Sequence, residues 1–336
     1  MNRRKLLIII LAGLFVPAFF AALFIGRFSL PPADVFGMLA AWLGISGSLN
    51  DWPEAAKVVL FQVRLPRLMM ALIVGSALAG SGTALQGVMR NPLVSPYILG
   101  LSAGASFGAA LVAAFFGDIY LLRQLFAFVG GVIATAAAYR IARVRSETPV
   151  LSLVLSGVLV GAFFTAMLSM VQLFVDPYRL AGIIFWMMGG LHRSSWVAVQ
   201  LSVGPVLLGL FVLYKMRWRL NVLSLGDDEA RSLGLNVSRD RTVFIGIATM
   251  LAATAVAFSG SIGWVGLMVP HMARMIVGPD HRAVMPFSFS LGAAFVLLSD
   301  TMARSLFEFE IPLGVITTLI GVPFFAYLLK KGEAAW

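Results

Sequence analysis

The segment with the clearest chemical potential is acidic and short: Gly226-Asp227-Asp228-Glu229-Ala230-Arg231-Ser232-Leu233-Gly234-Leu235. Acids favour the first turn of a helix because the N-terminal end of a helix carries partial positive charge. A glycine such as Gly234 favours the end of a helix. The spacing therefore predicts one short helix inside a polar loop at about 217–241. Such a helix is either a solvated loop element or a handle for a partner, and the residues alone leave both alternatives open.

A basic motif, Arg64-Leu65-Pro66-Arg67, stands at the start of the strongly apolar segment near 65–88. Proline suits the first turn of a helix, so we expect Arg64 and Arg67 to flank the start of that helix. Arginines at such places are commonly anchors whose charged ends reach the membrane surface. A docking site for acidic side chains of an external partner is the other interpretation. Taken alone, the motif favours the anchor.

Groups for enzymatic chemistry are sparse. The chain has no GxxxxGK[ST] phosphate loop, no HExxH zinc motif and no cysteine, so we expect neither ATP hydrolysis by this chain nor a metal site or cofactor. The three histidines are scattered, at His192, His271 and His281. Two segments, 91–96 with two prolines and 263–271 with two glycines and a proline, have the residues of helix breaks and turns. These segments indicate an architecture and reveal no reaction.

The elements that must position these groups are transmembrane helices. Of the 336 residues 60% are hydrophobic and 12% are charged, and the mean hydropathy is +0.94. A bilayer-spanning helix needs about 20 apolar residues. We predict a single all-α membrane domain, residues 1–336, of about ten spans, the first of them uncleaved. They lie near 6–26, 65–88, 98–116, 122–140, 150–174, 196–216, 242–258, 261–278, 283–299 and 313–330.

Three other features refine this prediction. The Gly-rich third and eighth spans are expected to be short or broken, and 181–192 to be a short helix that does not span. With both termini in the cytoplasm, 17 of the 25 Lys and Arg residues fall on the inner face with seven of the 15 acids. The whole net charge of +10 then lies inside, as the positive-inside rule requires, and nucleic acid is not the expected partner.

The second span has two ridges of small residues at a spacing of four, Ala71-Gly75-Ala79 and Ser76-Gly80-Ala84. Such ridges let helices approach closely, so we expect this span to lie deep in the bundle. Its polar residues Ser81, Thr83 and Gln86 are candidates to line a transport pathway. Hydrogen bonding between helices is the simpler alternative for each of them.

Taken together, seven segments resemble the FecCD-type permease family, which imports vitamin B12, iron-siderophores and haem. They occur in the family's order, from the second span nearly to the end of the chain: RLPR at 64–67, QGVMRNPLVSPYILGLSAGA at 86–105, WMMGG at 186–190, LSLGDDEARSLGL at 223–235, GSIGWVGLMVPHMAR at 260–274, GPDHR at 278–282 and EIPLG at 310–314. The set is specific because seven segments match in sequence order, whereas each alone is weak.

The resemblance implies a multi-pass permease subunit in a prokaryotic plasma or inner membrane. It implies a homodimer, two cytoplasmic ATPase subunits that bind the ATP, and a periplasmic or lipid-anchored substrate-binding protein. It assigns the docking of that protein to Arg64, Arg67 and Arg304. It assigns ATPase coupling to Gly226, Asp227, Asp228, Glu229, Ala230, Arg231, Gly234 and Leu235, and the inner gate to Thr148, Pro149, Val150, Leu151 and Ser152.

One rival function is a self-contained secondary transporter or channel, which needs no ATPase. Such proteins more often place ion-coupling carboxylates in mid-span, and we find no chain of them here. An intramembrane enzyme would need paired catalytic groups at one depth, which are also missing. Among cargoes, an iron-siderophore is the family's commonest. Vitamin B12, haem, molybdate and tungstate are equally compatible with the residues.

Overall fold

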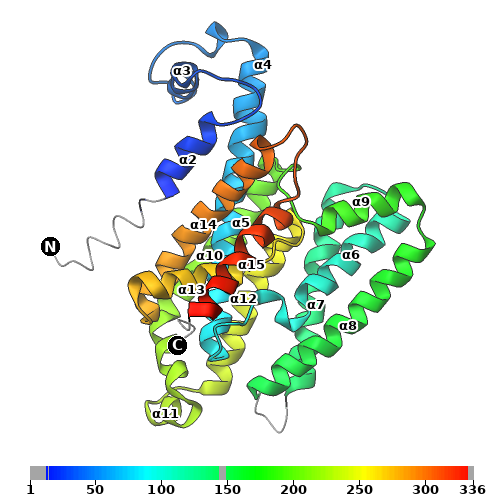
Figure 1. The fold of residues 1–336 in the computed structure, drawn as a ribbon, viewed down its shortest axis with the longest axis vertical. Helices are drawn as coiled ribbons and strands as arrows, with labels where there is room; N and C mark the ends of the chain where they lie inside the picture. The colour runs from blue at the N-terminus through cyan, green and yellow to red at the C-terminus, as the bar shows by residue number, and fades with distance from the viewer. Residues whose placement is uncertain (1–12, 14, 144–148, 332–336) are drawn as a thin grey trace, which may run out of the picture.

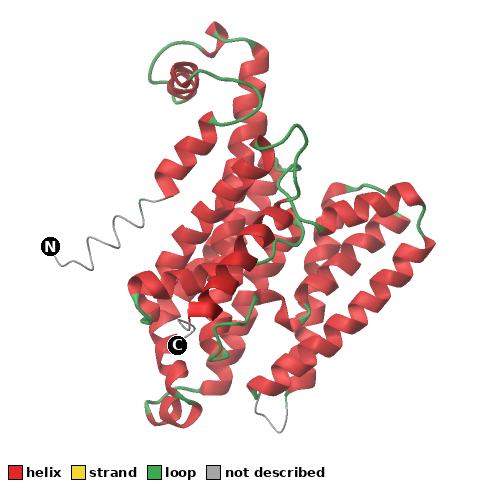
Figure 2. Ribbon diagram, viewed as in Figure 1, coloured by secondary structure: helices red, strands yellow, loops and turns green. Residues whose placement is uncertain are grey.

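The computed structural model describes residue 13 and residues 15–143 and 149–331. Every regular element in these residues is a helix (Figures 1 and 2). The elements are α2 (Phe15–Phe24), α3 (Pro32–Trp42), η1 (Leu49–Asp51), α4 (Glu54–Lys57), η2 (Val58–Arg64), α5 (Leu65–Val88), η3 (Pro96–Leu99), α6 (Leu101–Phe115), α7 (Tyr120–Ala142), α8 (Val150–Phe174), α9 (Pro177–Met187), α10 (Trp196–Leu225), α11 (Asp227–Ser232), α12 (Val237–Ser259), α13 (Val265–Val277), α14 (His281–Ser305) and α15 (Leu313–Lys331).

Six helices in the described part are long and apolar enough to cross a bilayer. They are the continuous helix Glu54–Val88, α7, α8, α10, α12 and α14; shorter apolar helices are α2, α6, α13 and α15. Each of the ten predicted segments overlaps one of these helices. The two Gly-rich segments form α6 and α13, which have only 15 and 13 residues. The all-helical membrane architecture is therefore confirmed, whereas the number of spans stays a prediction.

The predicted start of the second span was wrong. The helix begins at Glu54 and runs through Arg64 without a break, so Arg64 and Pro66 lie inside it. Residues Val58–Arg64 are wound as a π-helix, in which the amide of Leu65 donates to the carbonyl of Leu60. A proline inside an α-helix clashes with the carbonyl four residues earlier. The wider π turn next to Pro66 accommodates the ring without ending the helix.

Three further boundaries differ from the prediction. Helix α10 continues to Leu225 and α12 begins at Val237, so most of the predicted loop at 217–241 is helical. Helix α9 begins at Pro177, earlier than the predicted 181, because Asp176 caps its first turn. Helix α14 continues to Ser305, which places Asp300 inside the helix and not at its end. Helix α3 was not predicted.

Helix α5 lies at the centre of the bundle, as its small residues predict. In its apolar stretch 83% of the residues are buried, against 22% in α8. A β-carbon at Gly75 would overlap the carbonyl of Gly292 on α14, and one at Gly82 would overlap the carbonyl of Gly266 on α13. Glycine is therefore required at both positions because the neighbouring backbones touch α5 directly.

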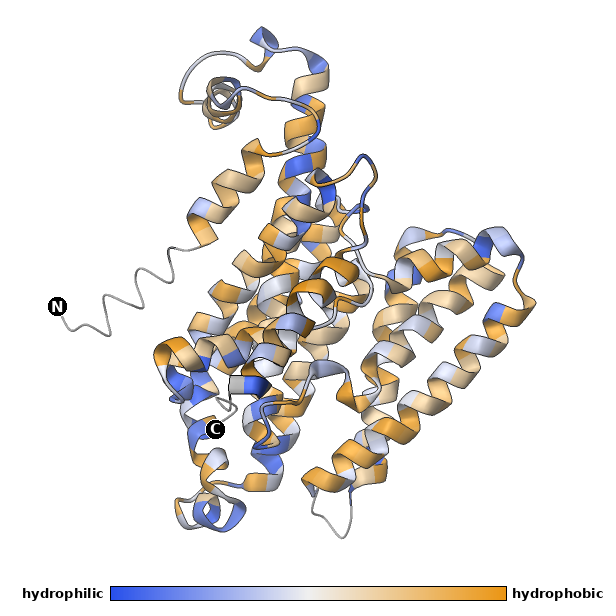
Figure 3. Cartoon of the chain, viewed as in Figure 1, coloured by the Kyte–Doolittle hydropathy of each residue, from blue (hydrophilic) through white to orange (hydrophobic). Residues whose placement is uncertain are grey.

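The remaining helices surround α5 unevenly. Helices α10, α12, α13 and α14 pack against it, whereas α6, α7, α8 and α9 form a second group that joins the first through α12 (Figure 1). Polar residues gather toward the two ends of the molecule and apolar ones lie between them (Figure 3). Helix α11 marks one end, and α3 with α4 marks the other. We call these the α11 end and the α3 end.

Candidate functional site

At the α11 end, the acidic segment forms the short helix that the sequence predicts. Helix α11 covers Asp227–Ser232, with all three acids in its first turn. Gly226 precedes it with φ +145° and Gly234 follows it with φ +82°. Both angles lie in a region that favours glycine. The amides of Gly234 and Leu235 close the helix on the carbonyls of Arg231 and Ala230.

One acid of α11 ties this helix to the centre of the bundle. The Asp227 carboxylate accepts a hydrogen bond of 3.1 Å from Arg90, which lies just after α5. It also accepts bonds of 2.9 and 3.2 Å from Arg241 in the first turns of α12. Since α5 and α12 are the two most buried long helices, Asp227 links a surface helix to the interior.

The other side chains of α11 divide into an inner and an outer set. Gly226 and Ala230 are buried, whereas Asp228, Glu229, Arg231 and Gly234 are exposed. Leu233, which our candidate residues omit, is 57% exposed. A single exposed leucine is ordinary on a protein surface. Leu233 lies in the same short segment as the candidate acids, and this position is the signal that could have found it in the sequence.

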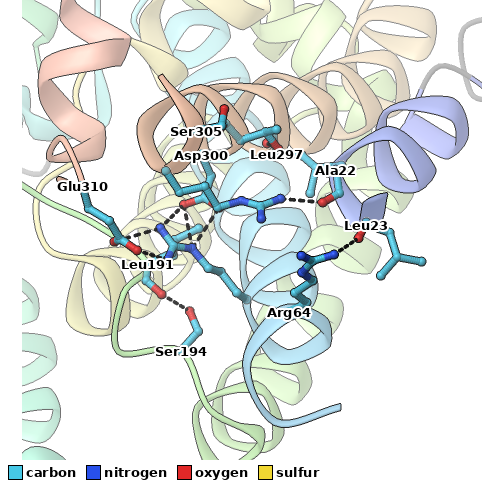
Figure 4. Close-up of polar contacts among 12 residues, drawn as sticks. Ala22, Leu23, Arg64, Leu191, Ser194, Leu297, Asp300, Ser305 and Glu310 are labelled. Carbon is cyan, nitrogen blue, oxygen red and sulfur yellow. Dashed lines mark hydrogen bonds and ion pairs between the residues drawn. The ribbon is translucent and has the colours of Figure 1, made fainter. Parts of the chain in front are cut away.

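At the α3 end, the three candidate docking arginines come together. Arg64 is 4% exposed and donates to the carbonyls of Leu23, at 2.8 Å, and Phe28. Arg304 is 8% exposed and donates to the carbonyl of Ala22. Figure 4 shows the Arg64 guanidinium directed at Leu23 in the last turn of α2. Carbonyls at a helix C-terminus lack partners within the helix, so these arginines cap α2 from η2 and α14.

Arg67 is held by two carboxylates. Its donors lie 3.0 to 3.1 Å from the oxygens of Asp300 on α14, and 2.8 and 3.2 Å from those of Glu310. Burial alone would raise the pKa of Glu310, but the hydrogen bond and the charge of Arg67 hold that pKa below its usual value. The Asp300 side chain is 1% exposed and also lies 3.7 Å from Arg304.

The cluster still carries excess positive charge. Four arginines meet here, because Arg27 donates to the carbonyls of Arg304 and Phe307, and two carboxylates face them. We define this group, Arg27, Arg64, Arg67, Arg304, Asp300 and Glu310, as the outer arginine cluster. The sequence did not indicate Asp300 or Glu310 as partners, because they lie 233 and 243 positions from Arg67.

The candidate gate residues lie at the start of α8, at the α11 end. Thr148 is outside the described residues, Pro149 precedes the helix, and Val150, Leu151 and Ser152 form its first turn. Leu151 is 71% exposed. The described residues therefore present an apolar side chain at the surface there.

The candidate pathway residues are buried and bonded to protein. The Ser81 hydroxyl donates to the carbonyl of Ala248 at 2.8 Å, and that of Thr83 donates to Ala79 at 2.8 Å. Gln86 donates to Val94 and Leu267 at 3.1 Å and accepts from Arg274. In this conformation Ser81 and Gln86 bond to other helices, as the simpler alternative expects, whereas Thr83 bonds within α5 itself.

The family model of the FecCD transport family matches residues 9–331 of the chain. The chain belongs to the FecCD transport family. Among related proteins, the molybdate import system permease protein MolB of Haemophilus influenzae is 40% identical over 314 residues, which are 92% of this chain and 91% of MolB. The cobalamin import system permease protein BtuC of Halobacterium salinarum is 41% identical over 282 residues, 84% of this chain and 76% of BtuC.

The iron(3+)-hydroxamate import permease FhuG of Bacillus subtilis is 36% identical over 333 residues, 95% of each chain. A solved structure described as an inward-facing conformation of a proposed metal-chelate type ABC transporter has a TM-score of 0.85 and 38% identity. It covers 96% of this chain and 98% of its own. The family predicted from the seven sequence segments is thus confirmed, and with it the role of an ABC importer permease.

Proposed function

We propose that this FecCD-family chain is the membrane subunit of a binding-protein-dependent ABC importer whose cargo is a metal chelate, in the first place an iron-siderophore. The observation that carries the proposal is α11, an exposed helix whose Asp227 joins it to Arg90 and Arg241 beside the two most buried long helices. Relatives named as permeases for molybdate, cobalamin and iron-hydroxamate support the cargo class.

In this proposal a separate ATPase binds α11 and supplies the energy for transport. The sequence has no phosphate-binding loop, so ATP binds to two cytoplasmic partner subunits. Asp228, Glu229 and Leu233 face the partner, and Asp227 passes its movement to α5 and α12. A ligand-driven change needs differential contacts in two states, and here the ATPase supplies them.

The architecture that serves this role has ten spans, with both termini in the cytoplasm of a prokaryotic plasma membrane. The basic residues of one face support that orientation. Two copies form the pathway between them. The surface of α8 is apolar and exposed, since Leu155, Leu159 and Phe163 are 56 to 63% exposed. This exposure is the observation that supports packing of α8 against a second copy. The start of α8 acts as the inner gate. The pathway runs between the two copies, and the buried residues Ser81, Thr83 and Gln86 of α5 do not line it directly.

The binding protein delivers cargo at the α3 end, onto the outer arginine cluster. Its carboxylates are attracted because the cluster has two more arginines than acids. Arg64 and Arg304 are occupied by α2, so docking through them requires partner carboxylates to replace carbonyls of α2. Docking through Arg67 requires a partner carboxylate to replace that of Glu310, which is the more exposed of the two carboxylates bound to Arg67.

Reconstitution tests this function. The chain is inserted in proteoliposomes with the ATPase and binding protein of its own gene cluster, and uptake of a radiolabelled ferric siderophore is measured. We expect uptake only when ATP and both helper proteins are present. Deletion of residues 228–234 should abolish association with the ATPase. Uptake by the chain alone, driven by an ion gradient, would instead establish the rival secondary transporter.

A further inference from the structure

A cavity at the end of the molecule opposite α11 has no role in the account above. It has a volume of about 750 Å³ and lies between α6 and α9. Small residues form much of its wall, among them Ala110 and Ala113 on α6 and Gly182 on α9. Tyr178 also lines it and is 90% exposed, so the cavity reaches the surface. Its volume is within the range of about 300 to 1,000 Å³ that is common for small-molecule sites.

Arg123, in the first turn of α7, is the unusual residue of this cavity. It lines the cavity although it is only 8% exposed. Its Nη1 lies 2.9 Å from Asp118, while its Nε and Nη2 have no hydrogen-bond partner. A guanidinium offers five N–H donors, and buried donors without acceptors are costly, the more so in a charged group. Two donor atoms of Arg123 therefore lack acceptors, and a ligand with an acceptor oxygen would bond to them.

The other charged groups of the lining also favour an anion. The lining contains Arg123, Arg179 and Arg193 but only one carboxylate, Asp118. Asp118 is already shared, because Arg193 donates to it at 2.7 Å. Arg179 donates to the carbonyl of Ala114 at 2.6 Å and pairs with Asp176 at 3.1 Å.

The remaining titratable group does not reverse this balance. Burial lowers the pKa of His192, which therefore stays neutral near pH 7 and adds no charge. Trp186 lines the cavity as well and offers a flat apolar surface beside the arginines. A ligand that fits has a negative group at one end and an apolar body.

We infer that this cavity binds a small anionic ligand, with a carboxylate or oxyanion group on Arg123 and its body against α6 and α9. If the proposed import function holds, the ligand class is an anionic metal chelate that waits here at the outer end of the permease. The assignment of the ligand to cargo rests on that function, but binding itself can be measured without ATPase or transport.

The test measures binding of ferric citrate to the full chain in lipid nanodiscs by isothermal titration calorimetry, without partner proteins. We expect saturable binding to the wild type and a loss of about 10-fold or more in Arg123→Gln, because a charge-assisted hydrogen bond is removed. A neutral ferric hydroxamate of similar size should bind more weakly than ferric citrate. Asp118→Asn should bind ferric citrate more tightly, since it removes the competing carboxylate.

A second variant protects the test against misfolding. A β-carbon at Gly182 would meet no atom within 4 Å, so Gly182→Leu adds an apolar side chain to the cavity wall with no clash at its β-carbon and should weaken binding. Lys57→Gln removes a positive charge at the same end but outside the cavity, and should bind as the wild type does. Wild-type affinity in both Arg123→Gln and Gly182→Leu would overturn the inference, as would the absence of saturable binding. Binding that persists when ATP-driven uptake fails would refute the import function and leave this site intact.

Discussion

The two ends of this permease use charge in opposite ways. At the α11 end, the Asp227 side chain is 32% exposed, and the helix that carries it displays its other polar side chains to solvent. At the α3 end, the Asp300 side chain is 1% exposed, and the arginines around it bond to carboxylates and to the carbonyls of α2. The first network attaches the exposed helix α11 to the bundle. The second joins α2, the helix Glu54–Val88 and α14 through buried side chains.

The difference teaches how burial decides what an ion pair does. A partly solvated ion pair such as Arg90–Asp227, whose side chains are 38 and 32% exposed, contributes about 0 to 1 kcal/mol, so the α11 end can rearrange at lower cost than the α3 end. Removing one member of a buried pair costs about 3 to 5 kcal/mol, so the α3 end resists change. We therefore expect variants at the α11 end to alter coupling, and variants at the α3 end to alter stability.

The largest effect should come from Asp300→Asn. This change leaves Arg67 and Arg304 buried with one carboxylate fewer, and we expect a loss of about 3 to 5 kcal/mol. Thermal unfolding in detergent measures it. Glu308→Gln, an exposed acid just beyond α14, is the matched control. Equal melting temperatures for the two variants would break the comparison between the two ends.

A somewhat smaller effect should follow Gly82→Val, which tests the packing that joins the two ends. The new side chain would overlap the backbone of Gly266, and overpacking of this kind costs about 1 to 3 kcal/mol. Gly246→Val is the control, because a β-carbon at Gly246 meets no atom within 4 Å. A loss of stability in the control as large as that in Gly82→Val would show that α5 is not held by close backbone contact.

At the α11 end, Asp227→Asn should cost less stability than Asp300→Asn, because the Asp227 side chain is 32% exposed and that of Asp300 is 1% exposed, and it should still lower transport. We expect the ATPase to co-purify in wild-type amounts, while cargo moved per ATP hydrolysed falls several-fold. Arg241→Gln should behave in the same way. Arg239→Gln, an exposed arginine on the same helix, should not. Unchanged stoichiometry in Asp227→Asn would remove this residue from the coupling path.

The smallest effect concerns Asp118. The hydrogen bond from Arg193 lowers the pKa of Asp118, burial opposes it, and the charge of Arg123 adds to the lowering. The carboxylate therefore contributes stability above its unfolded pKa, near 3.9, and loses that contribution as the pH falls through the lower folded value. Asp118→Asn should cost under about 1 kcal/mol at pH 7 and nothing near pH 2. A pH-independent difference in melting temperature would contradict this assignment.

Local sequence patterns predicted α11 and the central place of α5, because glycine spacing and acids in a first turn act over a few residues. The outer arginine cluster could be predicted only in part. The resemblance supplied Arg64, Arg67 and Arg304, but their partners on α2 and α14 depend on how helices distant in sequence pack. The π-helical turn before Pro66 and the extension of α10 were missed for a related reason, since tertiary contacts outweigh the local signals that suggest an ending.

Import by the proposed mechanism depends most directly on binding of the ATPase to α11. The chain has no cysteine, so Leu233→Cys introduces a single thiol at that surface. A thiol-to-amine cross-linker applied to membranes that contain the whole importer should yield an adduct of permease and ATPase. Asn50→Cys, at the α3 end, should yield none with the ATPase. An ATPase adduct from Asn50→Cys and none from Leu233→Cys would contradict the account.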